Sequence, residues 1–487
     1  MGMAKDWEME QEERGWWSIP GKYVCYECFE DESLKQVVRE NLTTSTCDYC
    51  GLTAEELTGE KTDLIAAPLD CVIKVIAEGF QSEWNNVDAE GIPYESAEGG
   101  YQAETMDTYD LVRDYVSPVD EDLARQIIDA LPDHTWVQRH YYSHSEDEAL
   151  WFGWNHFCEL VKHKTRYMFH LRGRRRDQPK AASILGVDTS AKPAEEAESG
   201  AATGSVTVSE DSDDTSAGMV TRFGIPMHLE PEEFETSDIE PLQAEREEGI
   251  PASGMLDAIG GAVEEVGLIR ELPAATKLFR GRLGPPNKPY CSARSLGPPP
   301  PRKAIANRMS PAGIPMFYGA LDEFTALAET ILGKLKRREV VNVGAFVTLE
   351  DFFVLDLTRL EPVPSIFSER RDRRPILKFL HSFVRDLSRA IKKDGREHIE
   401  YAPTQIVTEY FRHSFELQGG QVIRGILYPS SKALDGVACV LFFTREECGS
   451  PQRYRFASRK KQWLRFVRGS AKAFLRKPRR PSKNLFE

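Results

Sequence analysis

The sequence predicts a multidomain protein in which a small metal-binding module and an all-α domain precede a C-terminal α+β domain. Two Cys-x-x-Cys pairs lie close together near the start of the chain, and helical periodicity dominates the stretch that follows. In the C-terminal part, strand-like and helical segments are mixed. They show neither regular βαβ alternation nor a glycine-rich phosphate loop, which favours an α+β fold over a Rossmann fold.

The composition is that of a protein with ordinary hydrophobic cores. The chain has 487 residues, of which 41% are hydrophobic, and this is enough for two or three domains. It contains no apolar run of about 18 residues, and its acidic N-terminus lacks the apolar segment of a secretory signal. We therefore expect a cytoplasmic protein without a transmembrane helix.

The first cysteine-rich stretch, residues 18–55, is predicted to be a zinc knuckle. Its four cysteines follow the pattern C-x2-C-x18-C-x2-C: Cys25, Cys28, Cys47 and Cys50. Four thiolates at this spacing suit a tetrahedral Zn2+ ion in a closed site, so the metal is expected to hold structure and not to activate water. A redox-active pair is the alternative interpretation of the same residues.

A helical domain and a linker are predicted next. Apolar residues recur at helical spacing in three segments, residues 69–80, 123–131 and 148–169, which we assign to a domain over residues 60–171. Residues 172–254 lose this periodicity and are rich in Ser, Gly, Ala and acidic side chains. They are predicted to be a disordered or partly ordered acidic linker.

The α+β domain is predicted over residues 255–450. Helical periodicity marks three segments: residues 255–272, 376–391 and 404–415, the last with Thr404 as its N-cap. Short apolar runs predict five strands: residues 315–318, 340–349, 352–358, 421–428 and 436–443.

Basic residues are concentrated in the C-terminal tail of the chain. The net charge is −15, but residues 451–487 contain 13 Lys and Arg against one Glu, while the remainder carries a net −27. Apolar residues recur near one helical face of the tail: Trp463, Phe466, Val467, Ala471 and Phe474. We predict a basic amphipathic tail that packs within the protein or contacts an anionic membrane or nucleic acid.

Residues 307–329 carry three polar groups that suit one ligand. Arg308 lies in a Pro- and Gly-rich loop, where helix formation is disfavoured, and Tyr318 ends a short apolar strand. Glu329 follows on a helix that Asp322 can cap. A loop, a strand end and a helix in one short stretch can bring an arginine, a tyrosine and a glutamate together.

This stretch, NRMSPAGIPMFYGALDEFTALAE, resembles the signature of the RES domain, a family named for an arginine, a glutamate and a serine. LFRGR (residues 278–282) and GILYPSSK (residues 425–432) extend the resemblance to roughly residues 270–447. It implies a fold like that of ADP-ribosyltransferases and degradation of NAD+ by phosphorolysis or hydrolysis. Many such proteins are toxins, so a cognate antitoxin protein is an expected partner besides NAD+, and a homo-oligomer is possible.

The resemblance also assigns roles around the nicotinamide–ribose bond. Arg280 and Arg308 would hold phosphate groups, and Tyr318 would stack on or hydrogen-bond the nicotinamide riboside. Glu329 would stabilise an oxocarbenium-like transition state, and Ser430 would orient the ribose or the nucleophile.

Two of these assignments have neighbours that could replace them, and one position departs from the family. Arg282 is the alternative to Arg280 as a ligand-binding arginine, and Ser431 is the alternative to Ser430. The chain has Ser310 where RES domains of this kind usually have asparagine. Because a serine can donate the same kind of hydrogen bond, the proposed chemistry does not depend on this difference.

The helical domain, which ends in WFGWNHFCELVKHKTRYMFH (residues 151–170), resembles the HEPN-type domain found ahead of some RES domains. Many HEPN domains are ribonucleases with an Arg-x4–6-His motif, and Arg139 and His144 fit that spacing. So loose a motif also arises by chance, so a scaffold role is the preferred interpretation. A HEPN ribonuclease with a regulatory RES domain and a non-catalytic nucleotide sensor are the alternatives.

Overall fold

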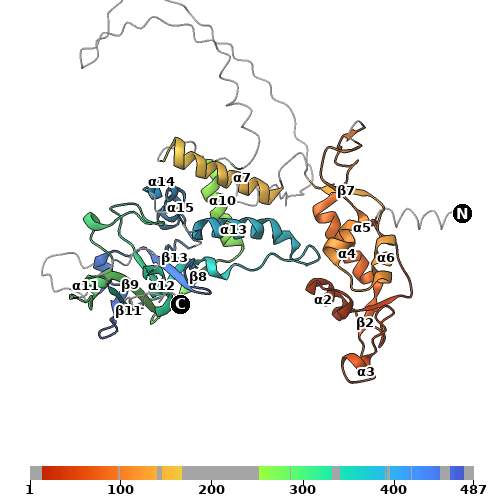
Figure 1. Cartoon of the computed structure of the whole chain (residues 1–487), viewed down its shortest axis with the longest axis horizontal. Helices are drawn as coiled ribbons and strands as arrows, with labels where there is room; N and C mark the ends of the chain where they lie inside the picture. Colours follow the sequence, from red (N-terminus) through yellow and green to blue (C-terminus); the bar gives the residue numbers. More distant parts are fainter. Residues whose placement is uncertain are drawn as a thin grey trace, which may run out of the picture. The chain divides into compact units, whose positions relative to one another are not determined.

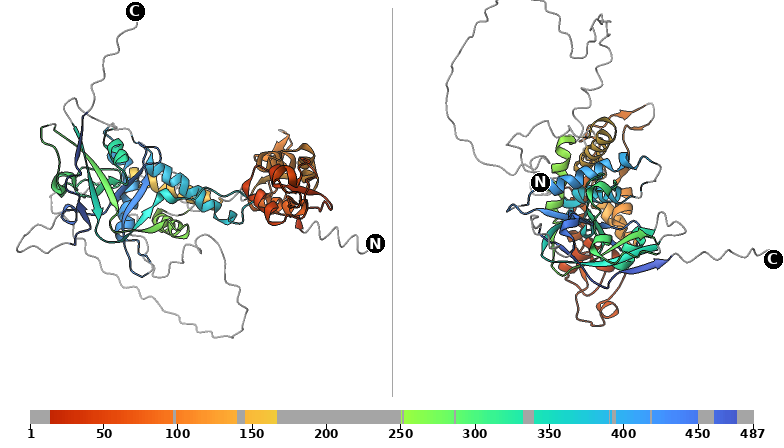
Figure 2. Two further views of the ribbon diagram at one scale, coloured as in Figure 1. Left: turned by 90° about the horizontal axis from the view of Figure 1, so that it is seen from below. Right: turned by 90° about the vertical axis from the view of Figure 1, so that its left-hand side faces the viewer.

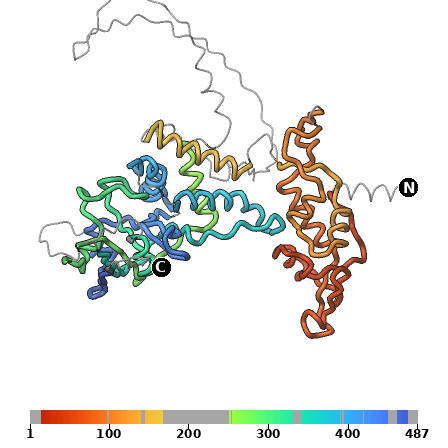
Figure 3. The backbone as a smooth tube through the Cα atoms, viewed as in Figure 1, coloured from red at the N-terminus to blue at the C-terminus, as the bar shows by residue number. Residues whose placement is uncertain are grey.

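The computed structural model describes residues 14–96, 99–139, 145–166, 250, 252–285, 287–331, 340–389, 391, 395–417, 419–449 and 461–475 of the chain. All of these residues belong to one compact unit, whose course can be followed in Figure 3. The segment predicted to be a linker, residues 172–254, lies outside the described residues except for 250 and 252–254.

The N-terminal region is mainly helical, as predicted. Its α-helices are α2 (Glu32–Glu40), α3 (Ala54–Leu57), α4 (Leu69–Glu83), α5 (Thr108–Leu111), α6 (Glu121–Asp129) and α7 (Glu146–Glu159). Asp31 and Asp120 begin α2 and α6, because each carboxylate accepts hydrogen bonds from two backbone N–H groups of the first turn. The apolar stripe predicted for α4 is completely buried: Leu69, Val72, Ile73, Ile76 and Phe80.

Short strands, which the sequence did not predict, complete this region. β1 (Tyr23–Cys25) pairs with β2 (Ala66–Pro68), and β4 (Tyr94–Glu95) pairs with β5 (Gly100–Tyr101). A three-stranded sheet has the order β3 (Trp84–Asn86), β7 (Thr135–Gln138), β6 (Thr105–Asp107). Strands this short give no recognisable period-2 pattern, so the all-α prediction for the module missed them.

One hydrophobic core joins the cysteine-bearing segment to helices α4 and α6, and two residues from much later in the sequence, Ile366 and Phe367, belong to it. The ring of Phe367 fills the space above Gly79, where a Cβ atom would come within 2.6 Å of the ring, and its centroid lies 5.9 Å from that of Phe80. The C-terminal half of the sequence therefore completes this core.

The C-terminal domain is built on one sheet, which in the described residues has nine strands. Its order is β15 (Leu464–Phe466), β11 (Val340–Thr348), β9 (Lys277–Gly284), β10 (Phe317–Ala320), β14 (Val437–Leu441), β13 (Ile423–Pro429), β12 (Phe352–Asp356), β8 (Ile269–Leu272), with β16 (Lys472–Leu475) also paired to β11. The strands, green to blue, are seen together in the left view of Figure 2. Among the paired strands that the structure describes in this sheet, only β12 and β13 are parallel, which confirms the predicted α+β class.

The helices of the C-terminal domain pack on the sheet or on one another. They are α10 (Ala252–Glu265), α11 (Ala293–Leu296), α12 (Glu323–Ile331), α13 (Arg374–Ser388), α14 (Glu397–Glu400) and α15 (Ala402–His413). α7, α10 and α13 pack side by side, as Figure 1 shows. The ring of Trp154 from α7 lies edge-on to that of Phe383 from α13, with the ring centroids 5.1 Å apart. The last α-helix of the N-terminal region thus packs on helices of the C-terminal domain.

The structure corrects the prediction for the basic tail. Its described part, residues 461–475, forms strands β15 and β16 and not an amphipathic helix. Phe466 pairs with Phe346 and Phe474 with Val341, so the tail supplies hydrogen-bond partners to β11, which would otherwise be an exposed edge. This tertiary pairing outweighs the helical spacing of the apolar residues, and residues 451–460 and 476–487 lie outside the described residues.

Three predicted helices need smaller corrections. α10 ends at Glu265, and the rest of its predicted range becomes β8, because Gly267 adopts a positive φ of 76° that stops the helix. α7 passes into the π-helix η3 (Leu160–Lys164) and ends before Thr165. Thr404 lies inside the first turn of α15 and is not its N-cap; its hydroxyl donates to the carbonyls of Tyr401 and Arg308.

The position of Phe367 leads to a stability prediction. Phe367→Ala should destabilise the N-terminal core by about 3–5 kcal/mol, because it leaves a cavity against α4. Hydrogen exchange along α4 measures this directly. Phe324→Ala, which truncates a side chain that is 69% exposed, is the matched control and should change stability by less than about 0.5 kcal/mol. Equal protection of α4 in both variants would contradict the packing assigned to Phe367.

Candidate functional site

The strand register assigns the candidate side chains to two faces of the sheet. Ala320 of β10 is paired with Phe279 of β9, so both side chains point to the same face. α12 packs on this face through Ala326. Because side chains alternate along a strand, Tyr318 shares the face of α12, whereas Arg280 points to the opposite one.

The hydroxyl of Tyr318 is fixed by the loop that precedes its strand. Ser310 Oγ lies 2.9 Å from it, and the backbone of Met309 also hydrogen-bonds it. Burial raises the pKa of Tyr318 from 10.0 to about 12, although these hydrogen bonds act in the opposite direction. Ser310, the departure from the RES pattern, is therefore the residue that holds the phenol.

The loop itself is held by α15. The side chain of Gln405 donates to the carbonyls of Asn307 (2.8 Å) and Ser310 (3.2 Å), and Thr404 donates to that of Arg308. Asn307 and Ser310 also exchange two backbone hydrogen bonds, which closes a tight turn around Arg308. The backbone of the arginine-bearing loop is thus anchored on both sides.

The guanidinium of Arg308 caps the C-terminus of α13. It donates to the carbonyls of Leu387 and Arg389, where the helix leaves carbonyl groups without intrahelical partners and where the dipole favours a cation. Burial lowers the pKa of Arg308, and the nearby Glu329 is among the groups that act against this shift. These two hydrogen bonds use two of the five N–H groups of a guanidinium.

Glu329 and Ser430 meet directly. Ser430 Oγ donates to Glu329 Oε1 at 2.6 Å. Ser430 Oγ also accepts hydrogen bonds from the backbone N–H groups of Lys432 (3.1 Å) and Ala433 (3.2 Å). The hydroxyl is therefore oriented by its own loop and points its proton at the carboxylate. Ser431, the alternative, is exposed.

Arg280 and Arg282 lie on the face opposite Glu329. Arg280 is 8% exposed, donates through Nη1 to the carbonyl of Tyr318 (2.9 Å) and lies 5.2 Å from the ring centroid of Phe317. Burial lowers its pKa to about 10, and the cation of Arg282 adds to this effect. Arg282 donates to the carbonyl of Ser295 at 2.8 Å. The structure does not bring either arginine to the Glu329–Ser430 pair.

The pairing of β9 with β10 explains why Arg280 lies where it does. β9 and β10 pair at one position only, Ala320 with Phe279, so the strands separate next to Tyr318. The guanidinium of Arg280 supplies a donor to the carbonyl of Tyr318 at this gap. Arg280 thus supports the strand that carries Tyr318, and its own Nε, among the described residues, is buried without a hydrogen-bond partner.

Sequence reasoning missed two tyrosines near these residues. Tyr428 of β13 and Tyr401, which precedes α15, both act electrostatically on Arg308. Tyr428 also interacts with Glu329 and Tyr318. One signal was readable: Tyr428 lies near the end of its strand, two residues before Ser430, so it must lie close to the serine.

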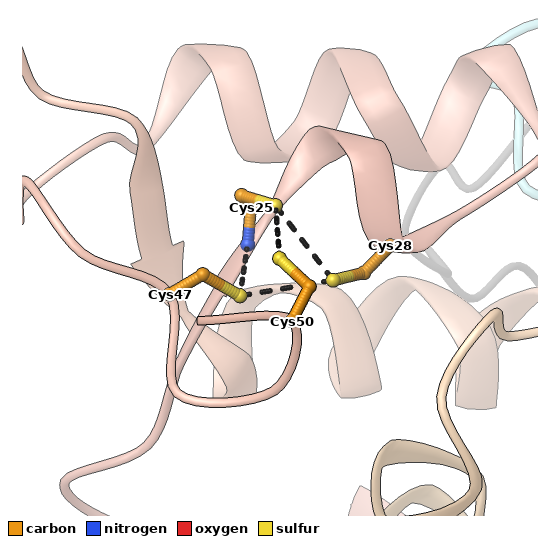
Figure 4. Close-up of side chains that lie close together, drawn as sticks. All are labelled: Cys25, Cys28, Cys47 and Cys50. Atoms are coloured by element: carbon orange, nitrogen blue, oxygen red, sulfur yellow. Dashed lines mark hydrogen bonds between the residues drawn. The ribbon is translucent and has the colours of Figure 1, made fainter. Parts of the chain in front are cut away.

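The four cysteines of the N-terminal motif converge, as Figure 4 shows. Their Sγ atoms all lie within 4.8 Å of one another, with separations of 3.4 Å between Cys25 and Cys50 and 3.7 Å between Cys28 and Cys47. Tetrahedral ligands at a Zn–S distance of about 2.3 Å would be about 3.8 Å apart, so the donor set fits this metal closely. Three of the four thiols are buried and Cys50 is exposed.

The Arg-x4–6-His motif is only half described. Arg139 donates through its backbone N–H to the carbonyl of Glu83 (2.9 Å) and through Nε to that of Trp84 (3.3 Å), so its described contacts join β7 to the end of α4. His144 lies outside the described residues. The ribonuclease hypothesis therefore stays a prediction.

Two family models match the chain. Residues 40–175 match HEPN/RES N-terminal domain 1, and residues 282–460 match the RES domain. Both resemblances seen in the motifs are thus confirmed, and the chain combines these two domains. The first match begins between the two cysteine pairs, and the second begins two residues after Arg280. No curated protein and no solved structure matched the chain, so the likeness to the fold of ADP-ribosyltransferases stays a prediction.

Among the residues that the structure describes, no helix combines the length and the apolar character needed to cross a membrane.

The raised pKa of Tyr318 leads to a prediction about stability and pH. The folded state holds the phenolic proton more tightly than the unfolded chain, so this contribution is intact below pH 10.0 and is lost as the pH rises through about 12. Tyr318→Phe should therefore reduce the fall in unfolding free energy over this interval. Denaturant titrations of both proteins at several pH values measure the effect. Identical pH dependence in both would show that Tyr318 is not shielded in the fold.

Proposed function

We propose that the RES domain of this chain degrades NAD+ by cleaving the bond between nicotinamide and ribose, by phosphorolysis or hydrolysis. The observation that carries this proposal is the 2.6 Å hydrogen bond between Ser430 and Glu329, formed close to Arg308 and on the side of the sheet that Tyr318 faces. Four of the five residues to which the RES resemblance assigns roles, all except Arg280, lie on or next to one face of the sheet. Like many proteins with a RES domain, this protein would then be a toxin or defence effector that a cognate antitoxin inhibits.

Glu329 would supply the main catalytic effect. Loss of nicotinamide leaves positive charge on the ribose, and a fixed carboxylate nearby stabilises that charge more than it stabilises the substrate. Ser430, whose hydroxyl already points at Glu329, would keep the carboxylate in one orientation. When the ligand binds, the hydroxyl can instead donate its hydrogen bond to a ribose hydroxyl or to the incoming nucleophile and so orient it.

The arginines would have different roles in the proposed site. Among the residues that the structure describes, Arg308 uses two donors to cap α13, so its other N–H groups can hold a phosphate of the dinucleotide. Arg280 would act from the opposite face by holding the carbonyl of Tyr318, and not by touching the phosphate as the sequence suggested. Arg282 would have no direct part in binding.

In both reactions the bond between nicotinamide and C1″ of the ribose breaks and its electron pair leaves with nicotinamide. Phosphorolysis forms ADP-ribose 1″-phosphate, and hydrolysis forms ADP-ribose. Product analysis with and without inorganic phosphate distinguishes the two.

Substitution of the carboxylate tests the enzyme assignment. Glu329→Gln should lower the rate of nicotinamide release by at least about a hundredfold, because the neutral amide cannot stabilise the developing charge. Glu323→Gln, on the same helix but paired with Lys472, is the matched control and should retain activity. Release of nicotinamide at the wild-type rate by Glu329→Gln would refute the catalytic role assigned to Glu329.

We also propose that Cys25, Cys28, Cys47 and Cys50 hold one structural Zn2+ ion. When bound, zinc would cross-link the segment around β1 to the turn at Cys50, both of which border the N-terminal core. Four thiolate ligands leave no open position for water or substrate, so the metal has no part in NAD+ cleavage.

The zinc proposal predicts one metal ion per chain. Cys47→Ser should lose the ion and unfold the N-terminal core, because zinc binding to such sites is worth about 10–16 kcal/mol at neutral pH. Metal analysis of the purified chain, together with hydrogen exchange along α2, measures both effects. Cys291→Ser changes an exposed cysteine outside the cluster and should keep the metal. A metal-free wild-type chain with a protected α2 would exclude the proposal.

A further inference from the structure

Tyr428 stands on the same face of the sheet as Tyr318, one strand removed. On the central strand β14, Tyr318 is paired with Val440 and Tyr428 with Ala438. Val440 and Ala438 are two residues apart, so their side chains point the same way, and so do those of their partners. The two tyrosines are thus diagonal neighbours across β14, and they interact electrostatically.

The phenol of Tyr428 is also surrounded by the residues of the proposed site. Glu329, Tyr318 and Arg308 all interact electrostatically with it. Along the chain it precedes Ser430 by two residues, and Ser430 is hydrogen-bonded to Glu329. Tyr428 therefore has every other member of the site as a neighbour in space or in sequence.

Its hydroxyl is better placed for a ligand than that of Tyr318. The hydroxyl of Tyr318 is engaged by Ser310, whereas that of Tyr428 forms no hydrogen bond among the residues that the structure describes. The side chain is only partly exposed, and burial raises its pKa well above 10.0. At neutral pH the group is therefore a protonated phenol with a donor to offer.

We propose that Tyr428 contacts the substrate, donating a hydrogen bond to a ribose hydroxyl that in turn donates to Glu329. This inference rests on the proposed cleavage of NAD+. A ribose hydroxyl both donates and accepts, a carboxylate only accepts, and a neutral phenol can donate. Glu329 and Tyr428 together therefore engage the hydroxyl both as donor and as acceptor, which neither residue can do alone, and they recognise a ribose beside the bond that breaks.

Removal of one oxygen atom tests this role. Tyr428→Phe should lower kcat/KM for NAD+ by about ten- to a hundredfold, the cost expected for one hydrogen bond to substrate in a shielded site, with an unchanged melting temperature. Tyr290→Phe is the matched control, since Tyr290 packs beside Arg282 on the opposite face of the sheet, and it should keep wild-type kinetics. Equilibrium binding of NAD+ to the full-length chain should weaken in the Tyr428 variant and not in the control.

The possible outcomes separate this inference from the proposed function. If wild-type protein neither binds nor consumes NAD+, the proposed function fails and the role of Tyr428 fails with it. If wild-type protein consumes NAD+ and Tyr428→Phe has unchanged kcat, KM and binding, the function stands and the role of Tyr428 is refuted. A lower melting temperature with unchanged kcat/KM would also refute it, because Tyr428 would then serve packing alone.

Discussion

The single register pair between Ala320 and Phe279 determines which candidate residues can meet. It joins β9 to β10, and strand alternation then sends Tyr318 toward α12 and Arg280 toward the opposite core. A shift of one residue would exchange these faces and separate Tyr318 from the helix that carries Glu329. The same regular ladder continues through β14 to β13, which brings Tyr428 and the Ser430 loop to that side.

The buried cations show how this arrangement is stabilised. Arg280 and Arg308 both have lowered pKa values because of burial, and their described hydrogen bonds go to backbone carbonyls and not to carboxylates. An arginine without a carboxylate partner is costly to bury, so each needs well-placed acceptors. Arg280 finds one where β9 and β10 separate, and Arg308 finds two at the end of α13. Both cations thereby stabilise the backbone that shapes the site.

Much of the fold was readable from the sequence because its signals are local. The periodicity of α4, α12 and α13 and the apolar runs of β11, β13 and β14 predicted these elements to within a few residues. The strands of the tail were not readable, because Phe466 and Phe474 become strand residues only through pairing with β11. The packing of Phe367 into the N-terminal core was not readable either, because its contact with Gly79 joins residues almost 300 positions apart.

The same distinction applies to the candidate site. Glu329 and Ser430 were identified from the motif, and the structure places them in hydrogen-bond contact. A motif gives the residue types but not the direction in which a strand turns its side chains, so it grouped Arg280 with residues on the other face. Tyr428 shows the converse, since only the register across β14 reveals its neighbours. Chemistry at this site therefore depends on alternation along three strands. β10 positions Tyr318, β9 supports it from the opposite face through Arg280, and β13 carries Tyr428 and leads into the loop whose serine orients Glu329.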